Sequence, residues 1–192
     1  MKYPPTTARR VIAVAAAAVA GLAISTAAYA ATSSGTSSGT AAAIPGCTAS
    51  DLGVWVAIDQ GNGAAGTIYY PLEFTNLSGR TCSLFGYPGV SVIGGNGYQL
   101  GSPAAWGSRS GAHTVNLAPG ATAHTILAYH DAAVGTEPGC GPVDTASLLR
   151  VYPPDQYNPT YAGFSFEVCS HAGPIYMNIT EPIIPGVGTV YG

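Results

Sequence analysis

The sequence predicts an all-β domain, an immunoglobulin-like antiparallel β-sandwich of about seven to nine strands. Short segments alternate between apolar and polar residues, which is the period of a strand with one buried face. Turn residues separate these segments, because the 192-residue chain contains 26 glycines and 15 prolines. No segment shows a sustained helical period with a capping residue at its start.

The first two predicted strands cover residues 52–59 and 68–75. In the first, Leu52, Val54, Val56 and Ile58 share an inner face, and Trp55 has the outward parity. In the second, Pro71 cannot donate a ladder hydrogen bond, so we expect an edge segment or a bulge at that point.

Residues 82–100 predict a short strand carrying Cys82, a Pro-Gly turn at 88–89, and a hairpin. The hairpin joins residues 90–93 to residues 98–100, and Asn96-Gly97 suits the positive φ angles of its tight turn. The tail, residues 182–192, fits either an added edge strand or a loose end. Further strands are predicted at 112–117, 121–129, 147–151, 164–169 and 175–180.

Residues 1–30 have the pattern of a secretory signal peptide. Lys2, Arg9 and Arg10 precede an apolar run over residues 11–24, and Ala28-Tyr29-Ala30 fits a cleavage site. An uncleaved membrane anchor is the alternative, but the run is shorter than the ~20 residues that a spanning helix needs. We expect a secreted, extracellular protein with no stable membrane anchor, associated with the cell wall or free. The general and twin-arginine export routes both stay open.

Residues 31–46 are rich in Ser, Thr, Gly and Ala and predict a flexible linker. The remaining residues, 47–192, have the length of one ordinary domain. The chain after the leader carries three arginines against nine acidic residues, a net charge of −6. Nucleic acid and anionic lipid are therefore excluded as partners, because both require clustered basic residues.

Four cysteines, Cys47, Cys82, Cys140 and Cys169, predict two disulfides in an exported chain. Three pairings are possible. We favour Cys47–Cys82 and Cys140–Cys169, because sequential pairing closes two loops of similar length, each contributing roughly 4 kcal/mol in the chain-entropy model. A zinc site is the alternative, but the chain lacks the Cys and His spacing typical of one.

The sequence predicts no catalytic residue, no metal site and no cofactor. Residues 107–111, Gly-Ser-Arg-Ser-Gly, resemble a nucleophile elbow with Arg109 in the place of the serine. Two of the nine carboxylates could still converge in a hydrolase, although their spacing singles out no pair. The four histidines are best interpreted as surface residues, with a metal-binding domain as the weaker alternative: His113, His124, His130 and His171.

Exposed aromatic side chains are the candidate binding surface. Trp55 faces outward, Trp106 lies in a Gly/Ser/Pro loop, and Tyr157 and Tyr161 flank Asn-Pro-Thr in another loop. Such side chains suit protein or carbohydrate surfaces of the cell envelope, so we expect a non-catalytic binding module. The alternative is structural: Trp55 packs beneath a loop or the tail, and the two tyrosines pin a long connection.

Several motifs together resemble one family. They are Phe-Thr-Asn at 74–76, Thr-Cys at 81–82, Gly-Tyr-Pro-Gly-Val at 86–90, Leu-Ala-Pro-Gly at 117–120 and Leu-Arg-Val-Tyr-Pro-Pro at 149–154. With Cys47, Gly66, Ala123 and Cys140, they resemble the secreted bacterial family called domain of unknown function 4232. The resemblance implies a secreted or envelope-associated β-sandwich of actinobacterial type, often on a tether. It carries no established active site, and this chain lacks the lipobox of many relatives.

Overall fold

The computed structural model describes residues 42–108, 110–131, 138, 140–171 and 176–190. The predicted leader, most of the predicted linker and Arg109 lie outside the described residues. Within the described part, no helix has the length and apolar character needed to cross a membrane.

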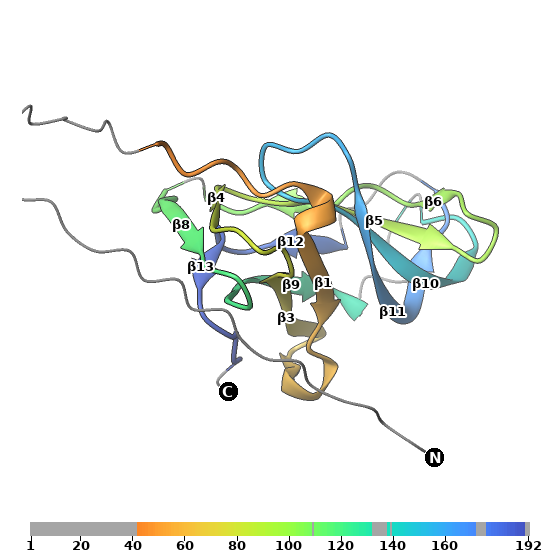
Figure 1. The fold of residues 1–192 in the computed structure, drawn as a ribbon. Helices are drawn as coiled ribbons and strands as arrows, with labels where there is room; N and C mark the ends of the chain where they lie inside the picture. Colours follow the sequence, from red (N-terminus) through yellow and green to blue (C-terminus); the bar gives the residue numbers. More distant parts are fainter. Residues whose placement is uncertain (1–41, 109, 132–137, 139, 172–175, 191–192) are drawn as a thin grey trace, which may run out of the picture. The chain divides into compact units, whose positions relative to one another are not determined.

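The described residues form an all-β fold, as predicted, with two single-turn 3-10 segments, η1 (Ala49–Asp51) and η2 (Ile58–Gln60). The prediction of a first strand over residues 52–59 was wrong at its end: the strand stops at Val56, and Ile58 starts η2 with 58% of its surface exposed. The strands are more numerous than expected, because several contain only two or three residues (Figure 1). In chain order they are β1 (Leu52–Val56), β2 (Asn62–Ala64), β3 (Thr67–Asn76), β4 (Cys82–Phe85), β5 (Gly89–Gly94), β6 (Gln99–Leu100), β7 (Ala105–Trp106), β8 (Thr114–Leu117), β9 (Thr122–Tyr129), β10 (Val143–Tyr152), β11 (Thr160–Cys169), β12 (Met177–Ile179) and β13 (Ile184–Pro185).

These strands form an open sandwich. One sheet has the order β1-β3-β9-β12-β7, with β2 added to β3 and β13 added to β9. The second has the order β11-β10-β5-β6, and β4 pairs with β8 in a separate two-stranded sheet. The pairings are antiparallel except β7 with β12, which run parallel.

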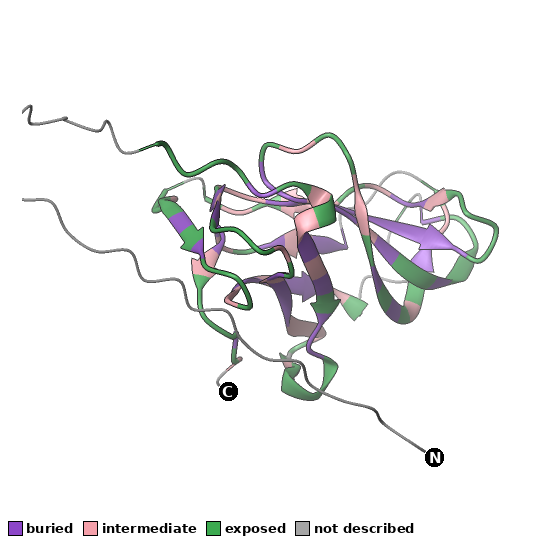
Figure 2. Ribbon diagram, viewed as in Figure 1, coloured by how far each residue is buried: buried purple, intermediate pink, exposed green. Residues whose placement is uncertain are grey.

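The core takes buried residues from all three sheets (Figure 2). The predicted alternation holds in β1 and β8, whereas β3, β5 and β9 bury runs of consecutive residues. Leu72, Phe74 and Leu127 point inward from the first sheet and are fully buried. Leu149 and Val151 fill the facing side from the second. Burial of this apolar surface is the main stabilising contribution to the fold.

Pro71 lies in β3 where its neighbouring strand changes. β1 pairs with β3 as far as Val56 opposite Leu72, and β2 begins with Asn62 opposite Tyr69. Between them the carbonyl of Pro71 accepts a hydrogen bond from the Ala57 N–H, at 2.9 Å. In an antiparallel sheet, the N–H and C=O of one residue point toward the same neighbouring strand. The N–H that Pro71 lacks would therefore point into the gap between the β1 and β2 pairings, where the described residues form no strand to accept it.

The predicted hairpin is confirmed as β5 and β6, with Val92 opposite Leu100. The tail also contributes a strand, β13. It pairs with the same edge of β9 as β12 does, further toward the start of β9. Asn76, at the end of β3, fixes the following turn: its buried side-chain amide donates to the carbonyls of Arg80 (2.8 Å) and Leu117 (2.9 Å).

Both predicted disulfides are confirmed. Cys47 and Cys82 have Cα atoms 4.8 Å apart, and Cys140 and Cys169 have Cα atoms 4.7 Å apart. The first joins the start of the domain to β4, where the Cys47 N–H also donates to the Ser83 carbonyl at 2.9 Å. The second links the residues before β10 to the end of β11.

Candidate functional site

Aromatic side chains gather around one groove on the surface, with a cavity volume of about 530 Å³. We call this the aromatic groove. Five aromatic residues line it together with smaller and polar ones: Phe85, Tyr87, Trp106, Tyr152 and Tyr157, with Gly86, Gly89, Ala112, Pro153, Asp155 and Gln156.

Two of the four predicted surface aromatics meet in this groove. Trp106 and Tyr157 line it, with 46% and 95% of their surfaces exposed. Trp55 is 42% exposed but lies on β1, where its cross-strand neighbour is Glu73. Tyr161 is 54% exposed and lines a different hollow, beside η1 and residues 158–160. The four aromatic residues predicted to form one binding surface therefore lie in three places: Trp106 and Tyr157 in the groove, Trp55 on β1, and Tyr161 beside η1.

The first wall of the groove is the turn from β4 to β5. Gly86 has a φ of +95°, in the left-handed region that glycine adopts without strain. The carbonyl of Gly86 accepts a hydrogen bond from the Ile183 N–H at 2.8 Å, which ties the turn to the tail. As a result, Phe85 and Tyr87 both reach the groove from either side of the glycine.

Trp106 is held in place through its polar edge. It belongs to β7 rather than to an irregular loop, and its Nε1–H donates to the Pro88 carbonyl at 2.8 Å. Its ring stacks on Tyr87, with ring centroids 6.1 Å apart and planes inclined by 29°. The Tyr87 hydroxyl in turn donates to the carbonyl of Ser108. Trp106 and Tyr87 thus form one fixed aromatic unit.

The opposite wall begins where β10 ends. Tyr152 pairs with Gly89 of β5, so the two walls are joined by the sheet itself. A turn follows, in which the Gln156 N–H donates to the Pro153 carbonyl at 3.0 Å and Asp155 has a φ of +58°. Proline at the second position and a positive φ at the third are typical of a type II turn, and Asp tolerates this conformation better than most residues.

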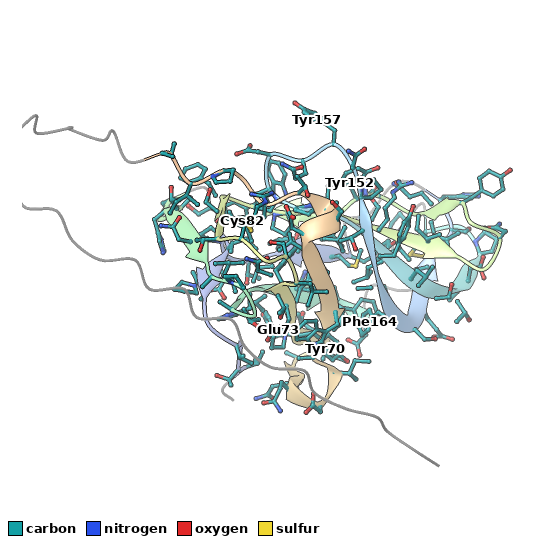
Figure 3. All side chains as sticks on the ribbon, viewed as in Figure 1. Tyr70, Glu73, Cys82, Tyr152, Tyr157 and Phe164 are labelled. Carbon is teal, nitrogen blue, oxygen red and sulfur yellow. A yellow bond between two sulfur atoms is a disulfide. The ribbon has the colours of Figure 1, made fainter. Side chains whose placement is uncertain are left out.

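Tyr157 projects from the tip of the loop that follows this turn, above Tyr152 (Figure 3). Beneath the loop, the Arg150 guanidinium lies 5.8 Å from the centre of the Tyr152 ring. Arg150 is itself fixed by Gln99, whose Oε1 accepts a hydrogen bond from Nη2 at 2.6 Å. The cation and the strand pairing together hold the Tyr152 ring at the groove edge.

A second feature, a buried carboxyl group, lies on the outer face of the β1–β3–β9 sheet. Glu73 is 1% exposed, and the tail covers it through a segment that we call the C-terminal strap, residues 184–188. The Gly188 N–H donates to Glu73 Oε1 at 2.8 Å, and among the described residues no hydrogen bond reaches Oε2. His124 lies opposite Glu73 on β9, and its Nδ1 is 2.8 Å from the Gly186 carbonyl oxygen.

Burial raises the pKa of Glu73 above its ordinary value. The hydrogen bond from Gly188 and the nearby His124 act in the opposite direction, with smaller effects. Gly188 fits closely, because a Cβ at this position would come within 2.5 Å of His124 and 2.7 Å of Pro71. The strap and the carboxyl group are therefore packed as one unit, away from the aromatic groove.

The interpretation of the histidines as surface residues was wrong for His124, which is 8% exposed beneath the strap. The side chains of three of the four histidines take part in local hydrogen bonds among the described residues. His130 lies between the Thr67 hydroxyl, 2.8 Å from Nδ1, and the Asn178 amide, 2.8 Å from Nε2. His113 Nδ1 is 3.2 Å from the Gly111 carbonyl oxygen. Among the residues that the structure describes, no three His, Cys, Asp or Glu side chains gather as a metal site would require.

The groove contains residues that sequence reasoning did not select: Phe85, Tyr87, Tyr152, Asp155 and Gln156. Two motifs gave a signal for them, since Gly-Tyr-Pro-Gly at 86–89 and Tyr-Pro-Pro at 152–154 combine aromatic residues with rigid turns. The pairing of Gly89 with Tyr152 brings these two motifs together.

Fold and groove together define the class of this protein: a disulfide-linked β-sandwich domain with an aromatic groove on its surface. A family model described as "Domain of unknown function (DUF4232)" matches residues 47–173, and the chain belongs to this family. Every residue that lines the groove falls within the matched range. No curated protein and no solved structure matches the chain.

Proposed function

We propose that this chain is exported and acts as a non-catalytic binding domain whose ligand, a component of the cell envelope, occupies the aromatic groove. The observation that carries the proposal is the aromatic lining itself. Ligand sites are concave, mostly apolar and lined by aromatic side chains with a few polar groups, and the groove has this composition. Its volume falls within the range of about 300–1,000 Å³ found for such sites.

Binding is favoured over hydrolysis by the charges at the groove. A hydrolase of the paired-carboxylate type needs an acid and a base on either side of the scissile bond. Of the residues that line the groove, Asp155 supplies the carboxylate, and Glu73 is buried beneath the strap on another face. The rigid aromatic unit, by contrast, offers apolar area at little cost in side-chain entropy.

Export is supported by the two disulfides, which form and persist in oxidising compartments. Together with the predicted leader, they lead us to expect a mature protein that starts at Ala31. N-terminal sequencing of the protein from culture medium and from the washed cell wall tests this. A chain that retains Met1 and stays with the cytoplasm would contradict it.

The binding proposal is tested by affinity capture. The exported protein, purified with its disulfides formed, is immobilised and exposed to cell-wall and secreted fractions of the host. Trp106→Ala removes the centre of the groove, and Trp55→Ala removes an equally exposed tryptophan from a different face. We expect Trp106→Ala to lose the captured component and Trp55→Ala to retain it. Equal capture by both variants would contradict binding at the groove.

A further inference from the structure

We infer that the ligand of the aromatic groove is a neutral saccharide chain. The inference rests on the proposed function and deepens it, because it names the chemical class of the ligand. Three features carry it: the internal hydrogen bonds of Trp106 and Tyr87, the exposed ring surfaces, and the hydrogen-bonding groups at the rim.

The polar groups of the central aromatic unit already have partners. Trp106 Nε1 donates to the Pro88 carbonyl at 2.8 Å, and the Tyr87 hydroxyl donates to the Ser108 carbonyl. A peptide ligand in an extended or polyproline conformation presents backbone carbonyls that need donors from the groove wall. These two donors are engaged within the domain, so the unit offers its ring surfaces rather than its N–H and O–H groups.

Exposed ring surfaces favour a ligand that presents C–H groups. The face of an aromatic ring carries partial negative charge, which attracts the weakly positive hydrogens of a sugar ring. Tyr157 and Phe85 are 95% and 51% exposed on opposite walls of the groove. A saccharide ring between such surfaces buries apolar area on its C–H face and leaves its hydroxyl groups at the edge.

The rim supplies groups that match those hydroxyls. The Asp155 carboxylate accepts hydrogen bonds, and the Gln156 side-chain amide both donates and accepts. Sugar hydroxyls also donate and accept, so both rim residues can be satisfied by one chain. Gln156 is steadied by its own backbone neighbour, because Nε2 donates to the Asp155 carbonyl at 3.2 Å.

The charge of the groove selects a neutral chain over an acidic one. Asp155 is exposed and lines the groove, so it places a negative charge at the rim. A uronate or phosphate group placed beside Asp155 would meet a like charge, which disfavours binding. The turn that carries Asp155 contains two prolines, which restrict its backbone and keep Asp155 at the rim of the groove.

The test asks separately whether the protein binds at all and which chemical class of ligand it binds. The host's insoluble cell-wall fraction is digested exhaustively with proteinase K, and retention of the full exported protein on it is measured. Oligosaccharides released from the digested wall by partial hydrolysis are then divided by anion exchange into neutral and acidic pools. Each pool is titrated against the protein as a competitor of wall binding.

We expect digestion to leave retention unchanged and the neutral pool to compete. Tyr157→Ala should weaken competition by about tenfold or more, since it removes a fully exposed ring without disturbing the core. Tyr98→Ala, at an exposed position of the β5–β6 hairpin, is the matched control and should leave the competition unchanged.

Two results would overturn the inference while leaving groove binding intact. One is retention that disappears after proteinase K, which identifies a protein ligand. The other is competition by the acidic pool at equal or lower concentration. An exported protein that binds neither the wall nor any secreted component contradicts the proposed function as well.

Discussion

Glu73→Gln should change how the stability of the domain depends on pH. The carboxyl group is buried under the strap, where Gly188 donates to one oxygen and the other has no hydrogen-bond partner among the described residues. Burial raises its pKa above the ordinary value of 4.5. Glutamine has nearly the same shape, keeps an oxygen that can accept from Gly188, and cannot ionise.

The sign follows from proton binding. Because the folded-state pKa is raised, the folded protein holds this proton at a pH where the unfolded chain has lost it. The stabilising contribution is complete below the unfolded pKa and is lost as pH rises through the folded pKa. In that window one proton changes the free energy of unfolding by at most about 1.4 kcal/mol per pH unit. Relative to wild type, Glu73→Gln should therefore gain stability as pH rises.

Urea unfolding of the disulfide-intact protein, followed by tryptophan fluorescence from about pH 4 to about pH 8, measures this difference. Taking wild type minus variant removes the contributions of titrating groups that do not interact with Glu73, and His124 is the neighbour whose charge couples to it. Glu167→Gln removes an exposed carboxylate from β11 and controls for the lost charge. If the curves of wild type and Glu73→Gln run parallel throughout, the buried carboxyl group does not titrate as argued.

Three further predictions concern stability and are checked by urea unfolding. Asn76→Ala should lower the free energy of unfolding by about 3 kcal/mol, because its buried amide donates to two carbonyls at 2.8 and 2.9 Å; an equal loss in the exposed control Asn116→Ala would argue against this. Gly188→Ala should destabilise, because its Cβ would lie 2.5 Å from His124, whereas Gly79→Ala meets open space and should be nearly neutral. Replacing both cysteines of either disulfide by serine should cost roughly 4 kcal/mol, and a loss under about 1 kcal/mol would contradict the chain-entropy argument.

Alternation along single strands predicted part of the core, but β3, β5 and β9 also bury consecutive residues, and Ile58 is exposed. Leu72 and Phe74 on one strand and Val54 on another all point inward as their parity requires. Of the three possible disulfide pairings, the one favoured for its two loops of similar length is the one in the structure. Parity depends on neighbours in sequence, so a local pattern can predict it, whereas the disulfide pairing could only be favoured among three.

The groove could be predicted only in part, because outward parity does not say which outward residues meet. Trp106 and Tyr157 were recognised as exposed aromatics, but Tyr152 joins them through the long-range register of β10 with β5. Glu73 also has outward parity, yet it is buried because the strap crosses that face. Trp55, on the same face, stays exposed. Such contacts between distant segments are set by packing, which the local pattern does not encode.

The position of the first disulfide has a mechanical consequence. Any pull on the chain before Cys47 passes directly into β4 through the bond to Cys82, so the residues between them cannot extend under load. The tail beyond Cys169 has no such bond, since it is attached by short ladders and the strap. Held at both ends in a force measurement, the domain should yield first from its carboxyl end. The two disulfides enclose segments with sequence separations of 35 and 29 residues. These segments should not add to the measured increase in chain length on unfolding until the disulfides are reduced.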